Sequence, residues 1–124
     1  MHVLGNMVGA VKRGGVVLDL QVIRPNPTVE VGGQVVCEID GEPLFRMADA
    51  ATAAVDTLIN AGRLVEQAID DHDVREHYAS GADLVDDFAG KKRQPPTSVL
   101  PWLLALAQPC VVRERCRLRR LRVR

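Results

Sequence analysis

Aromatic side chains are scarce in this chain: only 3% of its 124 residues are Phe, Trp or Tyr. A protein that stacks nucleic-acid bases on its surface needs several aromatic side chains close together, and this chain lacks them. It also has no apolar run near the roughly 18–20 residues that cross a bilayer, and residues 1–15 do not form a signal peptide. We therefore expect a cytoplasmic protein without a membrane partner.

Close cysteine pairs and the common catalytic motifs are missing as well. Cys37, Cys110 and Cys116 are widely spaced, whereas metal sites use close pairs such as CxxC. We expect structural, reduced thiols, with a redox or metal role as the alternative. No glycine-rich phosphate loop, HExxH or GxSxG motif is present, so the sequence predicts no cofactor and no metal.

The length suits a single domain over residues 1–124, and an apolar share of 47% is enough for a real core. The net charge is zero, but the charges are segregated. The first 109 residues hold 15 acids against nine bases, whereas residues 110–124 hold seven arginines against Glu114. Most of the acid excess lies between Glu66 and Asp87. An acidic body therefore precedes a strongly basic tail.

The first half of the chain contains three predicted elements. Residues 3–11 have the apolar spacing of a helix. Val16–Ile23 is a β-rich run typical of a strand buried on both faces, as in the middle of an α/β sheet. Gly32-Gly33 then joins Val29–Val31 to Gln34–Ile39, which predicts a β-hairpin with a tight turn.

A long helix is predicted next. Leu44–Met47 favours a short third strand, and Ala48 to about Asp70 has the i, i+3, i+4 apolar spacing and the many alanines of a helix. Val74–Tyr78 fits a short strand or a loop. Ser80 is a candidate N-cap with Asp83 three residues later, and a short helix should follow it.

The last part of the chain contains a helix and a strand. Val99–Ala107 is predicted to be helical after Pro101. Residues 110–124 alternate as a strand does, with one extra residue at Arg119-Arg120. This pattern predicts one strand with a β-bulge, or two strands in sequence, with an arginine face. The fold class is therefore α+β: a mixed, largely antiparallel sheet with helices packed on at least one face. The arginine face is a candidate interaction surface formed by Arg113, Arg115, Arg117, Arg119, Arg120 and Arg122.

We expect these arginines to cover the outer face of a terminal strand and to pair with the acids of residues 66–87, in this chain or in a neighbouring one. A protein partner is the first alternative. The second is a nucleic-acid-associated protein, since seven cations could neutralise several phosphates. We do not favour nucleic acid, because the acidic body would repel a polyanion.

Three residues are weak catalytic candidates. Asp19 lies inside an apolar strand, where a carboxylate needs a partner or a function. Glu76 and His77 could form an acid–base set or, with His72 and Asp73, bind a metal, although a solvated acidic turn is the favoured interpretation. The alternative function is therefore a small enzyme or ligand-binding module with a pocket near Asp19, Glu76 and His77.

The order of the elements and one short motif resemble a known family. A helix, Lys12-Arg13-Gly14-Gly15 and the strand at Val16–Leu20 look like the basic-Pro-Gly-Gly step before the fifth strand of S-adenosylmethionine-dependent methyltransferases with a Rossmann-like fold. Arg13 stands where that family has proline. The acidic helix after Ser80 and the terminal Val111–Val123 segment resemble the end of the same enzymes.

This resemblance covers most of the chain but only the carboxyl-terminal half of such an enzyme. The family holds its cofactor in the missing half, so the resemblance implies no cofactor-binding residue here. It also implies that the strand at Val16–Ile23 has lost its sheet neighbours and needs another cover. We therefore expect a non-catalytic methyltransferase-like domain that acts through binding, as a homodimer or with a missing methyltransferase-like partner chain.

Overall fold

The computed structural model describes residues 12–124, and the predicted helix over residues 3–11 lies outside this range. The described part contains a five-stranded antiparallel sheet and three α-helices, which confirms the α+β class. None of these helices is long and apolar enough to cross a membrane. In chain order the elements are β1 (Val16–Val22), β2 (Thr28–Val31), β3 (Gln34–Glu38), α2 (Glu42–Asn60), β4 (Leu64–Tyr78), α3 (Gly81–Phe88), the 3₁₀ helix η1 (Thr97–Val99), α4 (Leu100–Ala105) and β5 (Cys110–Val123).

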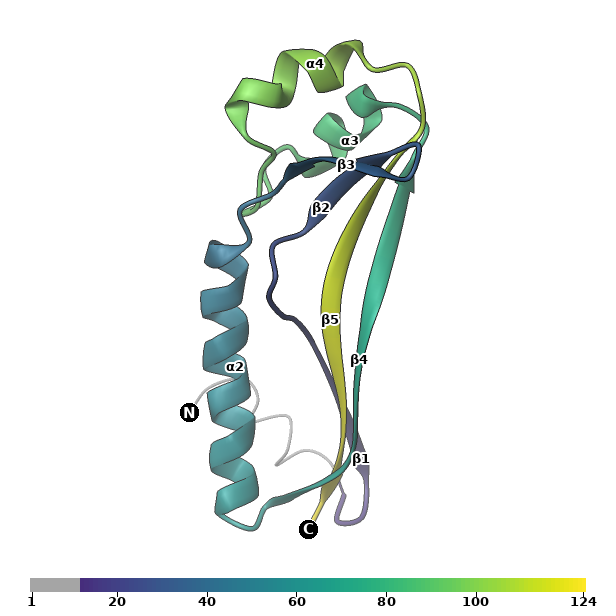
Figure 1. Cartoon of the computed structure of the whole chain (residues 1–124). Coiled ribbons are helices and arrows are strands. Elements are labelled where there is room, and N and C mark those ends of the chain that lie inside the picture. The colour runs from purple at the N-terminus through teal and green to yellow at the C-terminus, as the bar shows by residue number, and fades with distance from the viewer. Residues whose placement is uncertain (1–11) are drawn as a thin grey trace.

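The C-terminal strand β5 lies in the middle of the sheet. It pairs with β4 along its whole length on one side, and on the other side with β1 and then β2, while β3 extends β2. Figure 1 shows β4 and β5 side by side, with α2 running beside the sheet and α3 and α4 gathered at one end. β1 has β5 as its one neighbour among residues 12–124, so the prediction that Val16–Ile23 lies in the middle of a sheet is wrong.

No bulge interrupts β5. Its residues from Arg122 to Cys116 pair one to one with β1, and the extra residue lies on β4, where the register shifts between Glu66 and Ala68. The predicted bulge at Arg119-Arg120 is therefore on the wrong strand. Because side chains alternate across an uninterrupted strand, the odd-numbered residues of β5 share one face and the even-numbered residues share the other.

The extra residue in the alternating pattern at Arg119-Arg120 reflects a change of the buried face along β5. Toward the end of β5 the odd-numbered Leu121 and Val123 are buried, whereas toward its start the even-numbered Cys110 and Val112 are buried. We call the face of the odd-numbered residues the α2 face and the other the α3 face. Residues paired across the strands lie on the same face, so β1 and β4 extend both faces.

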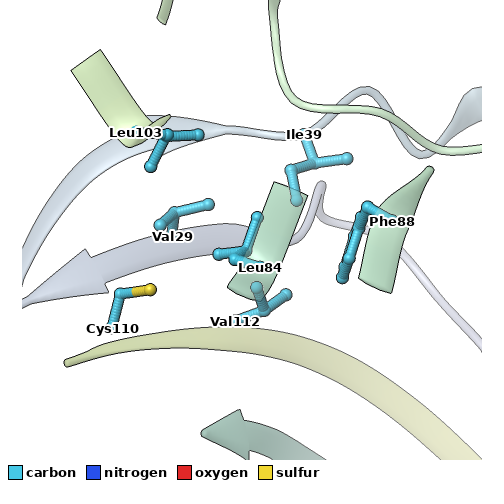
Figure 2. Close-up of a cluster of buried hydrophobic side chains, with 7 residues drawn as sticks. All are labelled: Val29, Ile39, Leu84, Phe88, Leu103, Cys110 and Val112. Carbon is cyan, nitrogen blue, oxygen red and sulfur yellow. The ribbon is translucent and has the colours of Figure 1, made fainter. Parts of the chain in front are cut away.

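Two hydrophobic clusters cover opposite faces at opposite ends of the sheet. On the α2 face, side chains of α2 pack on the strands in a cluster of Val17, Val55, Leu58, Leu64, Leu121 and Val123. On the α3 face, side chains of α3 and α4 lie against those of β2 and β5 (Figure 2). This second cluster consists of Val29, Ile39, Leu84, Phe88, Leu103, Cys110 and Val112.

The long helix begins and ends earlier than predicted. Leu44–Met47 is helical, and proline in the first turn of α2 is compatible with that start. Gly62 takes a positive φ of 76°, which ends the helix, and β4 starts at Leu64. The predicted helix over Ala48–Asp70 is therefore wrong after Asn60. Val74–Tyr78 is the end of β4, so its strand alternative is confirmed.

Two local predictions are confirmed. Gly32 and Gly33, both with positive φ, join β2 to β3 as the predicted hairpin. The Ser80 hydroxyl accepts a hydrogen bond of 3.2 Å from the backbone N–H of Asp83 and so caps α3. Short sequence signals thus placed these elements correctly.

Candidate functional site

Four arginines of β5 project from the α2 face, and each contacts an acid from another element. Three of these acids lie on β4 and one on β2. The pairs, with their N···O distances, are Arg113–Glu30 (3.0 Å), Arg115–Asp73 (3.2 Å), Arg117–Asp71 (2.8 Å) and Arg119–Glu66 (2.8 Å). The expected pairing of the tail with the acids of residues 66–87 therefore occurs within the chain, and it no longer supports self-association.

Arg119 is the most buried of the four, with 7% of its surface exposed. It also donates a hydrogen bond of 3.1 Å from Nη2 to Asp56 of α2, so it ties the helix to the sheet. Arg117 donates two hydrogen bonds to Asp71, and these bonds lower the pKa of that carboxyl. The arginines of this face therefore act as cross-strand structural contacts.

The arginines of the tail do not form one surface. Arg120 and Arg122 are even-numbered and lie on the α3 face, where Arg120 Nε donates a hydrogen bond of 3.0 Å to Gln67. The other four arginines lie beside the carboxylates of Glu30, Asp73, Asp71 and Glu66, which would repel a polyanion that runs along the strand. The geometry therefore gives no support to the nucleic-acid alternative.

The three weak catalytic candidates do not converge. Asp19 lies opposite Arg119 and Glu76 opposite Val112, seven positions apart on β5, or roughly 20 Å at the rise of a strand. Glu76 lies on the α3 face and His77 on the α2 face. The predicted pocket near these three residues is therefore absent from the described part of the chain.

Two of the candidates, Asp19 and Glu76, have local contacts instead. Asp19 Oδ1 accepts a hydrogen bond of 2.9 Å from Gln21, and Oδ2 is buried without a partner among residues 12–124. Glu76 Oε2 lies 2.8 Å from the Tyr78 hydroxyl, which also lies 2.6 Å from Asp87 Oδ2. Burial and the two carboxylates hold the pKa of Tyr78 far above its usual value, so this phenol stays protonated.

The acidic segment around His72 is a strand rather than the solvated turn that we expected. His72 and Asp73 are consecutive in β4, so their side chains lie on opposite faces. Among residues 12–124, no group of three or more His, Cys, Asp or Glu side chains is arranged to hold a metal. Cys110 and Cys116 are buried, and burial raises the pKa of both thiols, which makes them poor nucleophiles.

The surface that sequence reasoning missed lies on β1. Val16, Leu18 and Leu20 are on the α3 face, and they are 40%, 62% and 57% exposed because α3 and α4 cover only the other end of that face. The composition of Val16–Ile23 predicted burial on both faces of the strand. The polar residues Asp19 and Gln21, which alternate with the two leucines, were the signal that one face differs from the other.

A small pocket opens on the α2 face, where the chain passes from β1 to β2. Its volume is about 220 Å³. It is lined by Pro25, Asn26, Thr28, Asp73, Arg113 and Arg115. None of the three catalytic candidates lines it, and no sequence motif marks it, since its residues come from three separate parts of the chain.

Comparisons with known proteins give no relative for this chain. No family model, no curated protein and no solved structure matches it. The resemblance to methyltransferases therefore stays a prediction, and the function has to be argued from the geometry.

Proposed function

We propose that this chain is a non-catalytic binding domain that forms a homodimer through β1. The observation that carries the proposal is the row of exposed apolar side chains on this strand, with Leu18 and Leu20 more than half exposed. A small protein gains stability by covering such a row, at about 25 cal/mol per Å² of apolar surface.

The backbone of β1 supports the same conclusion. Within residues 12–124, β1 is an edge strand of seven residues without proline, and it pairs with β5 on one side only. Natural edge strands are usually short, charged or covered, because unpaired N–H and C=O groups recruit another strand. Asp19 is the one charged residue of β1, and it lies on the α2 face, away from the leucines.

A second copy of the chain is the partner that these features favour. Two antiparallel β1 strands related by a two-fold axis would join their free edges and bring the two apolar rows together, as closed dimers do. Four of the seven tail arginines pair with acids within each chain, so these four charges would not oppose the approach of a copy. A two-fold dimer would thus extend the antiparallel sheet across the axis.

The resemblance to methyltransferases fits this proposal as an explanation of its origin. A chain that corresponds to the second half of such an enzyme would have lost the neighbours of the strand at Val16–Ile23. Self-association would then replace the lost contacts. A separate methyltransferase-like partner chain would occupy the same edge, and the experiment below separates the two cases. Buried, unpaired Cys110 and Cys116 suit a reducing compartment, so we place the protein in the cytoplasm.

Replacement of Leu18 by lysine tests the proposal. Native mass spectrometry and light scattering should give a dimer for the purified protein and a monomer for Leu18→Lys, because the two new lysines would lie close together on the same face of the joined sheet and repel each other. Leu104→Lys is the matched control, since Leu104 is similarly exposed, at 56%, but lies on α4. This control should stay dimeric. A purified protein that is monomeric at micromolar concentration would refute the dimer and leave the partner chain as the occupant of β1.

A further inference from the structure

The pocket on the α2 face has a fixed wall. Where the chain leaves β1, the Ile23 N–H donates to the Arg115 carbonyl at 2.9 Å. The side chain of Asn26 then accepts a hydrogen bond of 3.0 Å from the Gly41 N–H, at the start of α2. The segment from Ile23 to Asn26 is therefore held at both ends, and it does not need to be ordered by a ligand.

The opposite wall consists of the start of β5 and its neighbours. Thr28 lies directly across from Arg113, and Arg115 is the next residue on the same face. Arg115 donates a side-chain hydrogen bond from Nη1 to Asp73, and the Nε of Arg113 lies 3.0 Å from a carboxylate oxygen of Glu30. Each guanidinium has five N–H donors, so both retain donors that can serve a ligand.

Thr28, one of the residues that line this pocket, has a polar atom without a partner in the described part of the chain. The Thr28 hydroxyl oxygen is buried and has no hydrogen-bond partner among residues 12–124. A buried hydroxyl without a partner costs free energy, which a ligand or an ordered water would recover. The guanidinium groups of Arg113 and Arg115 thus border a pocket of about 220 Å³ that Thr28 also lines, and a rotation about χ1 of Thr28 would bring its hydroxyl to a ligand there.

We propose that this pocket binds a small oxyanion that also carries a hydroxyl group. The guanidinium groups of Arg113 and Arg115 would take the oxyanion, and the Thr28 hydroxyl would donate to it. The carboxylate of Asp73 also lines the pocket, so a ligand hydroxyl would donate to it, whereas a bare dianion would be repelled. The volume is below that of pockets for drug-sized ligands, which limits the ligand to a few heavy atoms or to one end of a larger molecule.

Paired titrations test the ligand chemistry. At pH 6, backbone amide chemical shifts should respond to inorganic phosphate, which is then mostly the dihydrogen monoanion, with a dissociation constant on the order of 1 mM. Sulfate at the same ionic strength, which has no proton to donate to Asp73, should bind about tenfold more weakly or not at all. Titrations with glycolate and acetate repeat the comparison for a carboxylate with and without a hydroxyl group. Whichever of phosphate and glycolate binds more tightly shows whether the site prefers a phosphate or a carboxylate.

Variants assign the site. Thr28→Val removes the hydroxyl and keeps the β-branched shape, and it should weaken phosphate binding about tenfold. Thr57→Val is the matched control on α2 and should bind as the unmodified protein does. If Thr28→Val lowers the melting temperature, the amides of the unmodified protein whose chemical shifts change on titration still locate the ligand. Chemical shift changes at Asn26 and Thr28 would support the proposal. Equal binding of phosphate and sulfate, no binding, or shifts confined to other parts of the sheet would overturn it.

Discussion

Two leucines of β5, three residues apart, test whether the buried face changes along this strand. Leu121 is fully buried in the α2-face cluster, whereas Leu118 lies on the α3 face and is half-buried. A bulge between them would place both on one apolar face, as the sequence pattern predicted. An uninterrupted strand places them on opposite faces with different surroundings. Substitution of each by alanine therefore separates the two descriptions.

The expected magnitudes differ severalfold. Replacement of a fully buried leucine by alanine costs 2–5 kcal/mol in measured series, and we expect about 3 kcal/mol for Leu121→Ala, because the side chain packs between α2 and two flanking strands. For Leu118→Ala we expect about 1 kcal/mol, since part of this side chain remains in water. The first substitution alone is a large fraction of the 5–15 kcal/mol that is typical of a domain.

Urea unfolding followed by circular dichroism measures both free energies of unfolding. The protein concentration should be low and equal for all variants, so that association does not contribute to the result. We expect similar slopes against urea for the three proteins and a lower midpoint mainly for Leu121→Ala. Equal losses of stability for the two variants would refute a change of buried face and restore the bulged strand.

Two further substitutions test single contacts. In Arg117→Gln, Asp71 loses the partner that lowers its pKa. The variant should therefore have a lower free energy of unfolding than the unmodified protein above the unfolded aspartate pKa of about 3.9, and this difference should disappear as the pH falls through the lower pKa of the folded state. A difference that does not depend on pH would contradict this. In Gly81→Ala, the new Cβ would lie 1.9 Å from the Leu103 carbonyl oxygen, so α3 and α4 must separate. We expect the free energy of unfolding to fall by about 1–3 kcal/mol. An unchanged melting temperature would show that the two helices shift freely.

Local signals in the sequence predicted the short elements well. The Gly32-Gly33 turn and the Ser80 cap depend on residues adjacent in the chain, and both are confirmed. The end of α2 was missed because the apolar spacing continues past Asn60, whereas the positive φ of Gly62 ends the helix. The spacing of apolar residues does not reveal a single residue with a positive φ.

The candidate site was less predictable because it depends on which face each helix covers. The apolar run of β1 has the composition of a doubly buried strand, yet α3 and α4 cover only the far end of the α3 face, and Leu18 and Leu20 remain exposed. The sequence shows the extra residue at Arg119-Arg120, but its cause is that helices cover opposite faces of the sheet at the two ends of β5. The pocket lining, from Pro25 to Arg115, has no sequence motif at all.

Hydrogen exchange along β1 tests the proposed dimer most directly. The Ile23 N–H points to β5, so in an antiparallel pair the Asp19 amide also points to β5, while those of Leu18 and Leu20 point to the free edge. We expect the amides of Leu18 and Leu20 to be protected at high protein concentration and to lose protection on dilution, while the Asp19 amide stays protected throughout. Rapid exchange of Leu18 and Leu20 at every concentration would contradict self-association through β1.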